Sequence, residues 1–230
     1  MSAPLAIQRV DFPALPETFG PASGALVAPP GEERVPAVVL LQEYWGLNEH
    51  IQDLARRWAA EGFLVLAPDL YRGVLAEDAT KAGELMSQLD RGRALADIAG
   101  AVAQLRAHPR CRGKVGVTGY CMGGAYALAA AARLPDLDAV IPFYGIPPQQ
   151  DWSKITAPVQ AHFAEHDGWA KPDAARAIQE AVRAGGGEME LFVYDAQHAF
   201  CNDTRPAVYA AEHAATAWQR SVAFFRKHLA

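Results

Sequence analysis

Residues 115–126 read "VGVTGYCMGGAY", and this stretch decides the fold that the sequence predicts. Its apolar first half is typical of a strand, and a helix-forming run of small residues begins at Gly123. Gly119, Cys121 and Gly123 give the pattern glycine-x-nucleophile-x-glycine. A nucleophile at the apex of a sharp strand-to-helix turn has strained backbone, so the residues two positions on either side must be small. We therefore predict that Cys121 is the apex of such a turn.

The start of a helix would favour chemistry at Cys121. Unpaired backbone N–H groups and the positive end of the helix dipole stabilise a thiolate and a developing oxyanion. The N–H of Met122 is the expected oxyanion donor, because it directly follows the nucleophile. A buried structural cysteine is the usual role of any single cysteine, and the motif alone leaves that alternative open.

Strand candidates alternate with helix-period segments along the rest of the chain. The strand candidates are residues 37–42, 63–68, 114–119, 138–145, 158–164 and 189–195, with one or two antiparallel strands expected before Val27. Helices are expected from Asn48 to about Glu61, from about Asp90 to Arg106, and over residues 123–134, 172–187 and 205–229. This alternation predicts an α/β fold: a doubly wound, mostly parallel sheet of about seven to eight strands with helices on both faces.

Composition narrows the class of protein. The chain has 230 residues, of which 51% are hydrophobic, so we expect one domain over residues 1–230 with a sizeable core. The net charge of -5 without a basic cluster argues against nucleic acid as a partner, and no apolar run reaches the length of a membrane span. The first 16 residues lack the pattern of a signal peptide. Three cysteines at uneven spacing favour free thiols in the cytoplasm. A monomer is expected.

A nucleophile needs a base, and the base needs an acid to orient it. In doubly wound proteins with this turn, the chain order is nucleophile, acid, histidine. His198 lies after the last predicted strand, in "YDAQHAFCN", where that order requires the base. Asp167 follows the strand at 158–164 and precedes Gly168 in a turn, so we prefer it to Glu165 as the acid.

A second carboxylate lies at the end of the first parallel strand. Glu43 in "LLQEYWGLNEH" (40–50) ends that strand, and carboxyl ends of parallel strands share one rim of the sheet. The backbone N–H of Tyr44 is a candidate for the second oxyanion donor. His162 and His166 are spaced like a metal pair on a helix, but on the predicted strand they lie about 13 Å apart, too far for one ion. No nucleotide motif occurs, so neither a metal nor a cofactor is expected.

Four segments together resemble the dienelactone hydrolase family of the α/β-hydrolase fold, from about residue 10 to the end. These segments are residues 40–71, "GYCMGG", "AHFAEHDGWA" and "YDAQHAF". The resemblance implies a Cys121–His198–Asp167 triad that hydrolyses lactones or activated esters through a thioester. It also implies that Glu43 contacts the resting thiol and shifts when substrate binds. A carboxylate beside a thiol would keep the thiol neutral until then.

The family pattern is not complete in the residues that hold the substrate. Members that act on dienelactones bind the substrate carboxylate with two arginines, and the arginine expected soon after His198 is absent. The candidates are Arg205, Arg72, Arg91 and Arg93. Aromatic residues at strand ends are candidates for the pocket wall: Trp45, Tyr71, Tyr144, Trp169 and Phe200.

Two other functions remain open on the sequence. The same triad would serve a general carboxylesterase or thioesterase for another small substrate. Alternatively, Cys201 lies three residues after His198 and could approach Cys121, so that a disulfide or oxidised thiol would switch a binding surface on the hydrolase scaffold.

Overall fold

The computed structural model describes residues 4–148 and 150–230 and confirms the alternation of strands and helices. The chain forms two compact units, Met1–Gly116 and Val117–Ala230. The strand order is β1-β2-β4-β3-β5-β6-β7-β8, and β5 (Cys111–Tyr120) is the strand that belongs to both units.

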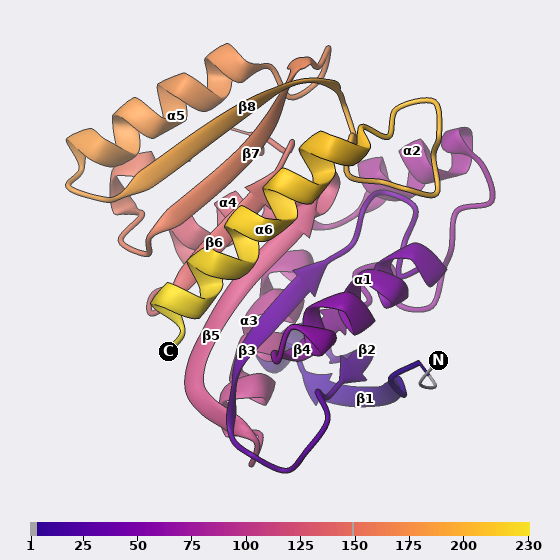
Figure 1. The fold of residues 1–230 in the computed structure, drawn as a ribbon. Helices are drawn as coiled ribbons and strands as arrows, with labels where there is room; N and C mark the ends of the chain where they lie inside the picture. The colour runs from indigo at the N-terminus through magenta and orange to yellow at the C-terminus, as the bar shows by residue number, and fades with distance from the viewer. Residues whose placement is uncertain (1–3, 149) are drawn as a thin grey trace. The chain divides into compact units, whose positions relative to one another are not determined.

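The first unit confirms the antiparallel strands expected near the amino terminus. β1 pairs with β2 and β2 pairs with β4, both antiparallel, whereas β3 and β4 are parallel. The bounds are β1 Gln8–Pro13, β2 Pro21–Val27, β3 Val35–Leu41 and β4 Leu64–Pro68. In Figure 1, α1 (Glu49–Ala60) lies in front of these strands and α3 (Arg91–Ala107) lies behind them. Every residue of β4 is buried, as expected of a strand covered on both faces.

The second unit continues the parallel pattern. β6 pairs with β7 and β7 with β8, all parallel. The bounds are α4 Met122–Arg133, β6 Ala139–Phe143, β7 Val159–His166, α5 Pro172–Ala184, β8 Met189–Gln197 and α6 Ala211–His228. Helix α6 crosses in front of these strands and α4 lies behind them (Figure 1), which confirms helices on both faces.

Helix ends follow the local chemistry that the sequence indicated. The Asn48 side chain accepts the N–H of Ile51, and Asp90 accepts that of Arg93, so both cap the helices that follow them. Gly62 has a φ of 96°, the left-handed conformation that favours glycine after a helix. Pro172 opens α5, where its missing N–H costs nothing.

Two parts of the predicted fold were wrong. Helix α2 (Ala79–Gln88), capped by Asp78, was not predicted; only one of its residues, Ala82, is buried. The final helix begins at Ala211 rather than Arg205. Its expected first turn is instead a tight turn, in which the N–H groups of Val208 and Tyr209 donate to the Arg205 carbonyl at 3.0 and 3.1 Å. Several strands also differ from prediction at their ends, most notably β5, which begins three residues earlier, and β8, which continues to Gln197.

Among the described residues, no helix is long and apolar enough to cross a membrane.

Candidate active site

Cys121 occupies a strained position between β5 and α4. It has φ 57° and ψ −117° and directly precedes the first residue of α4. A side chain other than glycine seldom adopts positive φ, and holding it there costs about 1–3 kcal/mol. The Cys121 N–H donates to the Phe143 carbonyl at 3.1 Å, and the Ala125 N–H donates to the Cys121 carbonyl at 3.1 Å. These bonds hold the predicted sharp turn in place, with the Cys121 side chain buried.

Two glycines around this turn are required by close approach of backbone. A Cβ on Gly124 would collide with the Phe143 carbonyl oxygen, so the helix could not lie so near β6. A Cβ on Gly145 would collide with the Cys121 carbonyl oxygen and the Ala125 nitrogen. Gly145 was missed in the sequence, because its need for a small residue arises from a turn 24 positions away in the chain.

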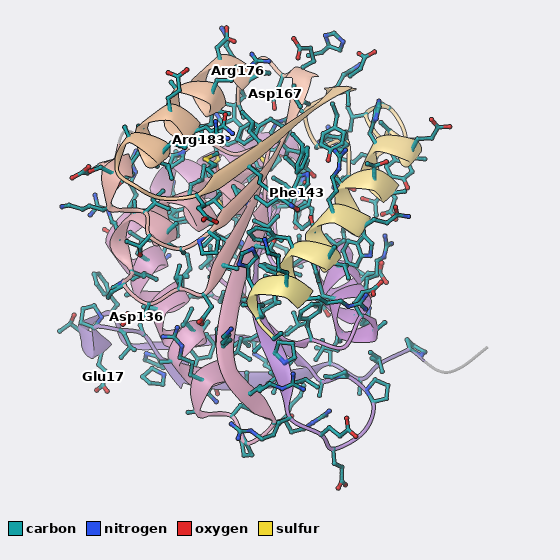
Figure 2. The ribbon with its side chains drawn as sticks, turned by 60° about the vertical axis from the view of Figure 1, so that its left-hand side comes forward. Glu17, Asp136, Phe143, Asp167, Arg176 and Arg183 are labelled. Atoms are coloured by element: carbon teal, nitrogen blue, oxygen red, sulfur yellow. The ribbon has the colours of Figure 1, made fainter. Side chains whose placement is uncertain are left out.

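Asp167 and His198 meet at the ends of β7 and β8. The His198 Nδ1 lies 2.6 Å from Asp167 Oδ2, and Asp167 Oδ1 accepts the N–H groups of Trp169 and Ala170 at 2.8 and 2.9 Å. Figure 2 shows Asp167 near the ends of the strands and Phe143 deeper in the same unit. Both oxygens of the Asp167 carboxylate are therefore satisfied, and the aspartate fixes the imidazole through Nδ1.

Burial and hydrogen bonding act in opposite directions on Asp167. Burial raises the pKa of Asp167, but the hydrogen bond and charge of His198 lower it, and so do the N–H groups of Ala170 and Trp169. The net effect is a pKa below the ordinary value, so that Asp167 remains ionised beside the imidazole at neutral pH.

Aromatic rings surround His198. Tyr144 and Trp169 contact its ring edge-on, with centroids 5.2 and 5.3 Å away. Phe200 packs against Tyr144 at 5.4 Å, and both of these side chains are fully buried, so they support the histidine from within. Trp169 is 49% exposed and is the one ring of the three that presents a surface to an incoming molecule.

The other residues of this unit that the sequence singled out lie on α4 and in the loop between β8 and α6. Met122 is the first residue of α4. Arg205 is partly exposed, in the turns before α6. Cys201 is partly exposed in the loop after His198, and the three cysteines form no disulfide, so the structure contains no Cys121–Cys201 bridge.

The predicted residues of the first unit lie at the ends of β3 and β4. Glu43 follows β3 and is buried, and the Tyr44 and Trp45 rings pack together with centroids 4.5 Å apart. The Gly46 N–H donates to the Glu43 carbonyl at 3.3 Å, which forms the predicted turn. Tyr71, in the loop after β4, is buried.

The arginines proposed for substrate binding in this unit have internal partners. Arg72 donates to Asp97 Oδ1 and to the Pro21 carbonyl, both at 2.7 Å. Arg93 donates to the Leu70 carbonyl at 3.3 Å. These contacts hold the Arg72 guanidinium in a fixed orientation, with its side chain 27% exposed.

Within residues 4–148 and 150–230, no three metal-ligating side chains cluster in a way that could hold an ion. His162 and His166 both lie on strand β7, as predicted, one buried and the other exposed.

A mostly parallel, doubly wound sheet with a strained strand-to-helix turn and a His–Asp pair at strand ends defines the α/β-hydrolase class. Comparison with known proteins supports the same class. The model of the "Dienelactone hydrolase family" matches residues 23–229. "Protein usf" of Aquifex pyrophilus is 36% identical over 205 residues, covering 84% of this chain and 89% of that protein. "Putative carboxymethylenebutenolidase" of Aquifex aeolicus is 34% identical, with the same two coverages.

A solved structure extends the likeness to three dimensions. The crystal structure of "Putative Dienelactone Hydrolase" from Klebsiella pneumoniae is 30% identical and has a TM-score of 0.83, covering 96% of this chain and 99% of that one. The chain belongs to the dienelactone hydrolase family. It is a hydrolase acting on carboxylic ester bonds, which confirms the family and the fold class predicted from the sequence.

Proposed function

We propose that this hydrolase uses Cys121 as its nucleophile, His198 as its general base and Asp167 as the group that orients the base. The observation that carries the proposal is the backbone of Cys121, whose φ of 57° is costly for any side chain. Such strain at the start of a helix is the geometry of a nucleophile elbow, which exposes the reactive atom at the strand ends. A purely structural cysteine has no need of it.

The proposed reaction is acyl transfer to sulfur. The Cys121 thiol gives its proton to His198 Nε2, because Nδ1 is engaged by Asp167, and the sulfur attacks the carbonyl carbon of the ester or lactone. The N–H groups of Met122 and Tyr44 receive the oxyanion. The leaving alcohol or enol takes the proton from His198 as the carbon–oxygen bond breaks, leaving a thioester.

Deacylation reverses these roles. His198 removes a proton from water, the resulting hydroxide attacks the thioester, and the carboxylic acid leaves as the thiolate recovers its proton. Lactones and activated esters suit this nucleophile, because a tetrahedral intermediate expels a thiolate readily unless the other group departs faster. We place Glu43 beside the resting thiol, where its charge would keep the thiol protonated until substrate binds.

The exposed ring of Trp169 points to an unsaturated or aromatic substrate. It stands edge-on to the base, so a planar conjugated acyl group or leaving group could pack against it at the site of reaction. Arg205 is the proposed partner for a substrate carboxylate, with Trp45, Tyr71 and Arg72 as further candidates for substrate contact. Tyr144 and Phe200 are fully buried, so they support His198 from within and do not line the pocket. A nucleophilic thiol suits the reducing cytoplasm, and we expect a monomer of 24.8 kDa by sedimentation.

The test is turnover of dienelactones, p-nitrophenyl acetate and small thioesters by wild type, Cys121→Ala and Cys121→Ser. Cys121→Ala should lose at least about 10³-fold in kcat, and mass spectrometry of rapidly quenched wild type should show an acyl group on Cys121. Cys201→Ala is the matched control and should keep wild-type kinetics. The preferred member of the panel identifies the substrate class. Wild-type rates in Cys121→Ala would overturn the triad.

A further inference from the structure

A buried histidine that the proposed reaction does not use lies in the middle of β7. His162 is completely inaccessible to solvent and stacks against Phe143 on β6 and Phe192 on β8, with centroids 4.7 and 5.6 Å away. Both of its ring nitrogens are hydrogen-bonded: Nδ1 to the Tyr194 hydroxyl at 2.8 Å, and Nε2 to Gln160 Oε1 at 3.2 Å and Ser221 Oγ at 3.1 Å.

The partners determine which nitrogen carries the proton. Ser221 Oγ donates its only hydrogen to the Ala217 carbonyl at 2.8 Å, so it accepts from His162. The Gln160 oxygen can only accept, so His162 Nε2 bears the hydrogen and Nδ1 accepts from the Tyr194 hydroxyl. Arg220 in turn donates to the Tyr194 oxygen at 3.1 Å. Every donor thus has an acceptor when His162 is neutral, and burial and Arg220 lower the pKa of His162 to about 3.

This network joins the elements that carry the proposed acid and base. His162 lies five residues before Asp167 on β7, and Tyr194 lies four residues before His198 on β8. The register of the two strands is regular up to the pair of Ala164 with Tyr194 and then shifts between Ala164 and His166. The network therefore joins β7 to β8 by buried hydrogen bonds. It lies just before the irregular strand ends that lead to Asp167 and His198.

Ring contacts lead from the network to the base. Tyr194 packs on Phe200 with centroids 5.0 Å apart, Phe200 packs on Tyr144 at 5.4 Å, and Tyr144 packs on His198 at 5.2 Å. Phe200 and Tyr144 are fully buried and have little room to move independently. A displacement of Tyr194 would therefore reach His198 both along the strand and through the packed rings.

We propose that the network formed by His162, Tyr194, Arg220 and Ser221 is a positioning device for His198, which aligns the ends of β7 and β8 so that Asp167 and His198 meet. A saturated polar network has directional contacts, so it fixes the side chains that join two strands more narrowly than apolar packing does. This role rests on the proposed function of His198. None of the four residues is a catalytic residue, because each acts only through the strands or α6.

Tyr194→Phe tests the proposal by removing one hydroxyl and little volume. We expect kcat to fall about tenfold with KM within twofold, since small errors in the geometry of the base affect the chemical step. The second readout needs no activity: the His198 Nδ1 proton, held in a 2.6 Å hydrogen bond to Asp167, should give a downfield proton NMR signal in wild type. That signal should shift upfield or broaden in Tyr194→Phe.

Tyr209→Phe is the matched control, because it makes the same chemical change on an exposed ring outside the network. It should match wild type in kcat and in the NMR signal. Ser221→Ala removes one acceptor of His162 Nε2 and should change both readouts in the same direction as Tyr194→Phe, by less. If Tyr194→Phe does not fold, the kcat and NMR signal of Ser221→Ala test the positioning role by themselves.

Two results would overturn the positioning role. One is a Tyr194→Phe enzyme with the kcat and NMR signal of Tyr209→Phe. The other is a variant that loses only stability, which would make the network part of an ordinary core. Failure of the proposed function can be told apart from failure of the positioning role. If wild type were inactive on every substrate, the kinetic comparison would be lost, but the NMR comparison would still test the alignment of Asp167 with His198.

Discussion

Each unit contains a buried carboxylate that is hydrogen-bonded to a partly exposed basic side chain, and the two pairs have similar geometry. Arg72–Asp97 in the first unit and His198–Asp167 in the second have contacts of 2.7 and 2.6 Å. In both, the carboxylate side chain is fully buried and its partner is 27% exposed. Yet the pKa of Asp97 is raised and that of Asp167 is lowered.

The two carboxylates differ at their second oxygen. Asp97 Oδ2 is buried with no hydrogen-bond donor among the described residues, so burial outweighs the hydrogen bond and charge of Arg72. Asp167 Oδ1 receives two backbone N–H groups from the turn that follows it. The lesson is that a buried carboxylate remains ionised when the N–H groups of its own turn add to the hydrogen bond and charge of its partner, so that together they outweigh burial.

The largest effect is expected when the charge of Asp167 is removed. Asp167→Asn keeps an oxygen for the N–H groups of Trp169 and Ala170, so the turn should persist. Without the negative charge, the His198 imidazolium is no longer stabilised and its tautomer is no longer imposed. We expect kcat to fall about 10³-fold or more, with little change in stability. Steady-state kinetics and a urea unfolding curve measure both, and a loss below tenfold would contradict the proposed role.

The opposite result is expected for the other pair. Asp97→Ala leaves Arg72 half-buried without its counter-charge, so the free energy of unfolding should fall by about 2 kcal/mol, less than for a fully buried pair because Arg72 is partly solvated. kcat and KM should stay within twofold, as measured beside the unfolding midpoint in urea. A large rise in KM alone would instead show that Arg72 contacts substrate and that Asp97 orients it.

His162, another buried titratable group of the second unit, sharpens the comparison because it is held neutral. The pKa of His162 is about 3 in the folded protein, against about 6.5 when unfolded, so the unfolded chain binds more protons between these values. Its contribution to stability is therefore complete above about pH 6.5 and is lost as the pH falls towards 3. Below about pH 5.5, wild type should lose about 1.4 kcal/mol more per pH unit than His162→Gln.

Urea unfolding at pH 7, 5.5 and 4.5 measures that slope for both proteins. His166→Gln is the control, since His166 is exposed and its replacement should leave the slope of wild type intact. Equal slopes in wild type and His162→Gln would show that His162 is not held neutral.

The smallest effect is expected for a pair that resembles the proposed catalytic one in everything but burial. His166 and Asp195 lie on the same two strand ends with a contact of 2.7 Å, and their side chains are 61% and 85% exposed. Because water screens such a pair, Asp195→Asn should change the free energy of unfolding by less than about 0.5 kcal/mol and leave kcat within twofold. A tenfold loss of kcat would show that this outer pair also supports His198.

Local patterns were enough to predict most of the fold. The alternation of apolar strands with capped helices identified the architecture, because burial on both faces and the chemistry of Asn48, Asp90 and Pro172 act over a few residues. Helix α2 was missed because only one of its residues is buried. The late start of α6 was missed because residues 205–210 form turns, in which the Ala210 N–H donates to the carbonyl of Phe200, ten residues earlier.

The same distinction separates the parts of the candidate site. The sequence by itself determined the types and order of the proposed reactive groups, because a glycine-flanked cysteine, an aspartate and a histidine follow successive predicted strands along the chain. Only the tertiary structure decided that His198 and the turn after Asp167 together lower the pKa of Asp167, that Gly145 must be small and that His162 is hydrogen-bonded to Tyr194 between β7 and β8. These properties depend on which distant groups share a buried space, and no local pattern records that.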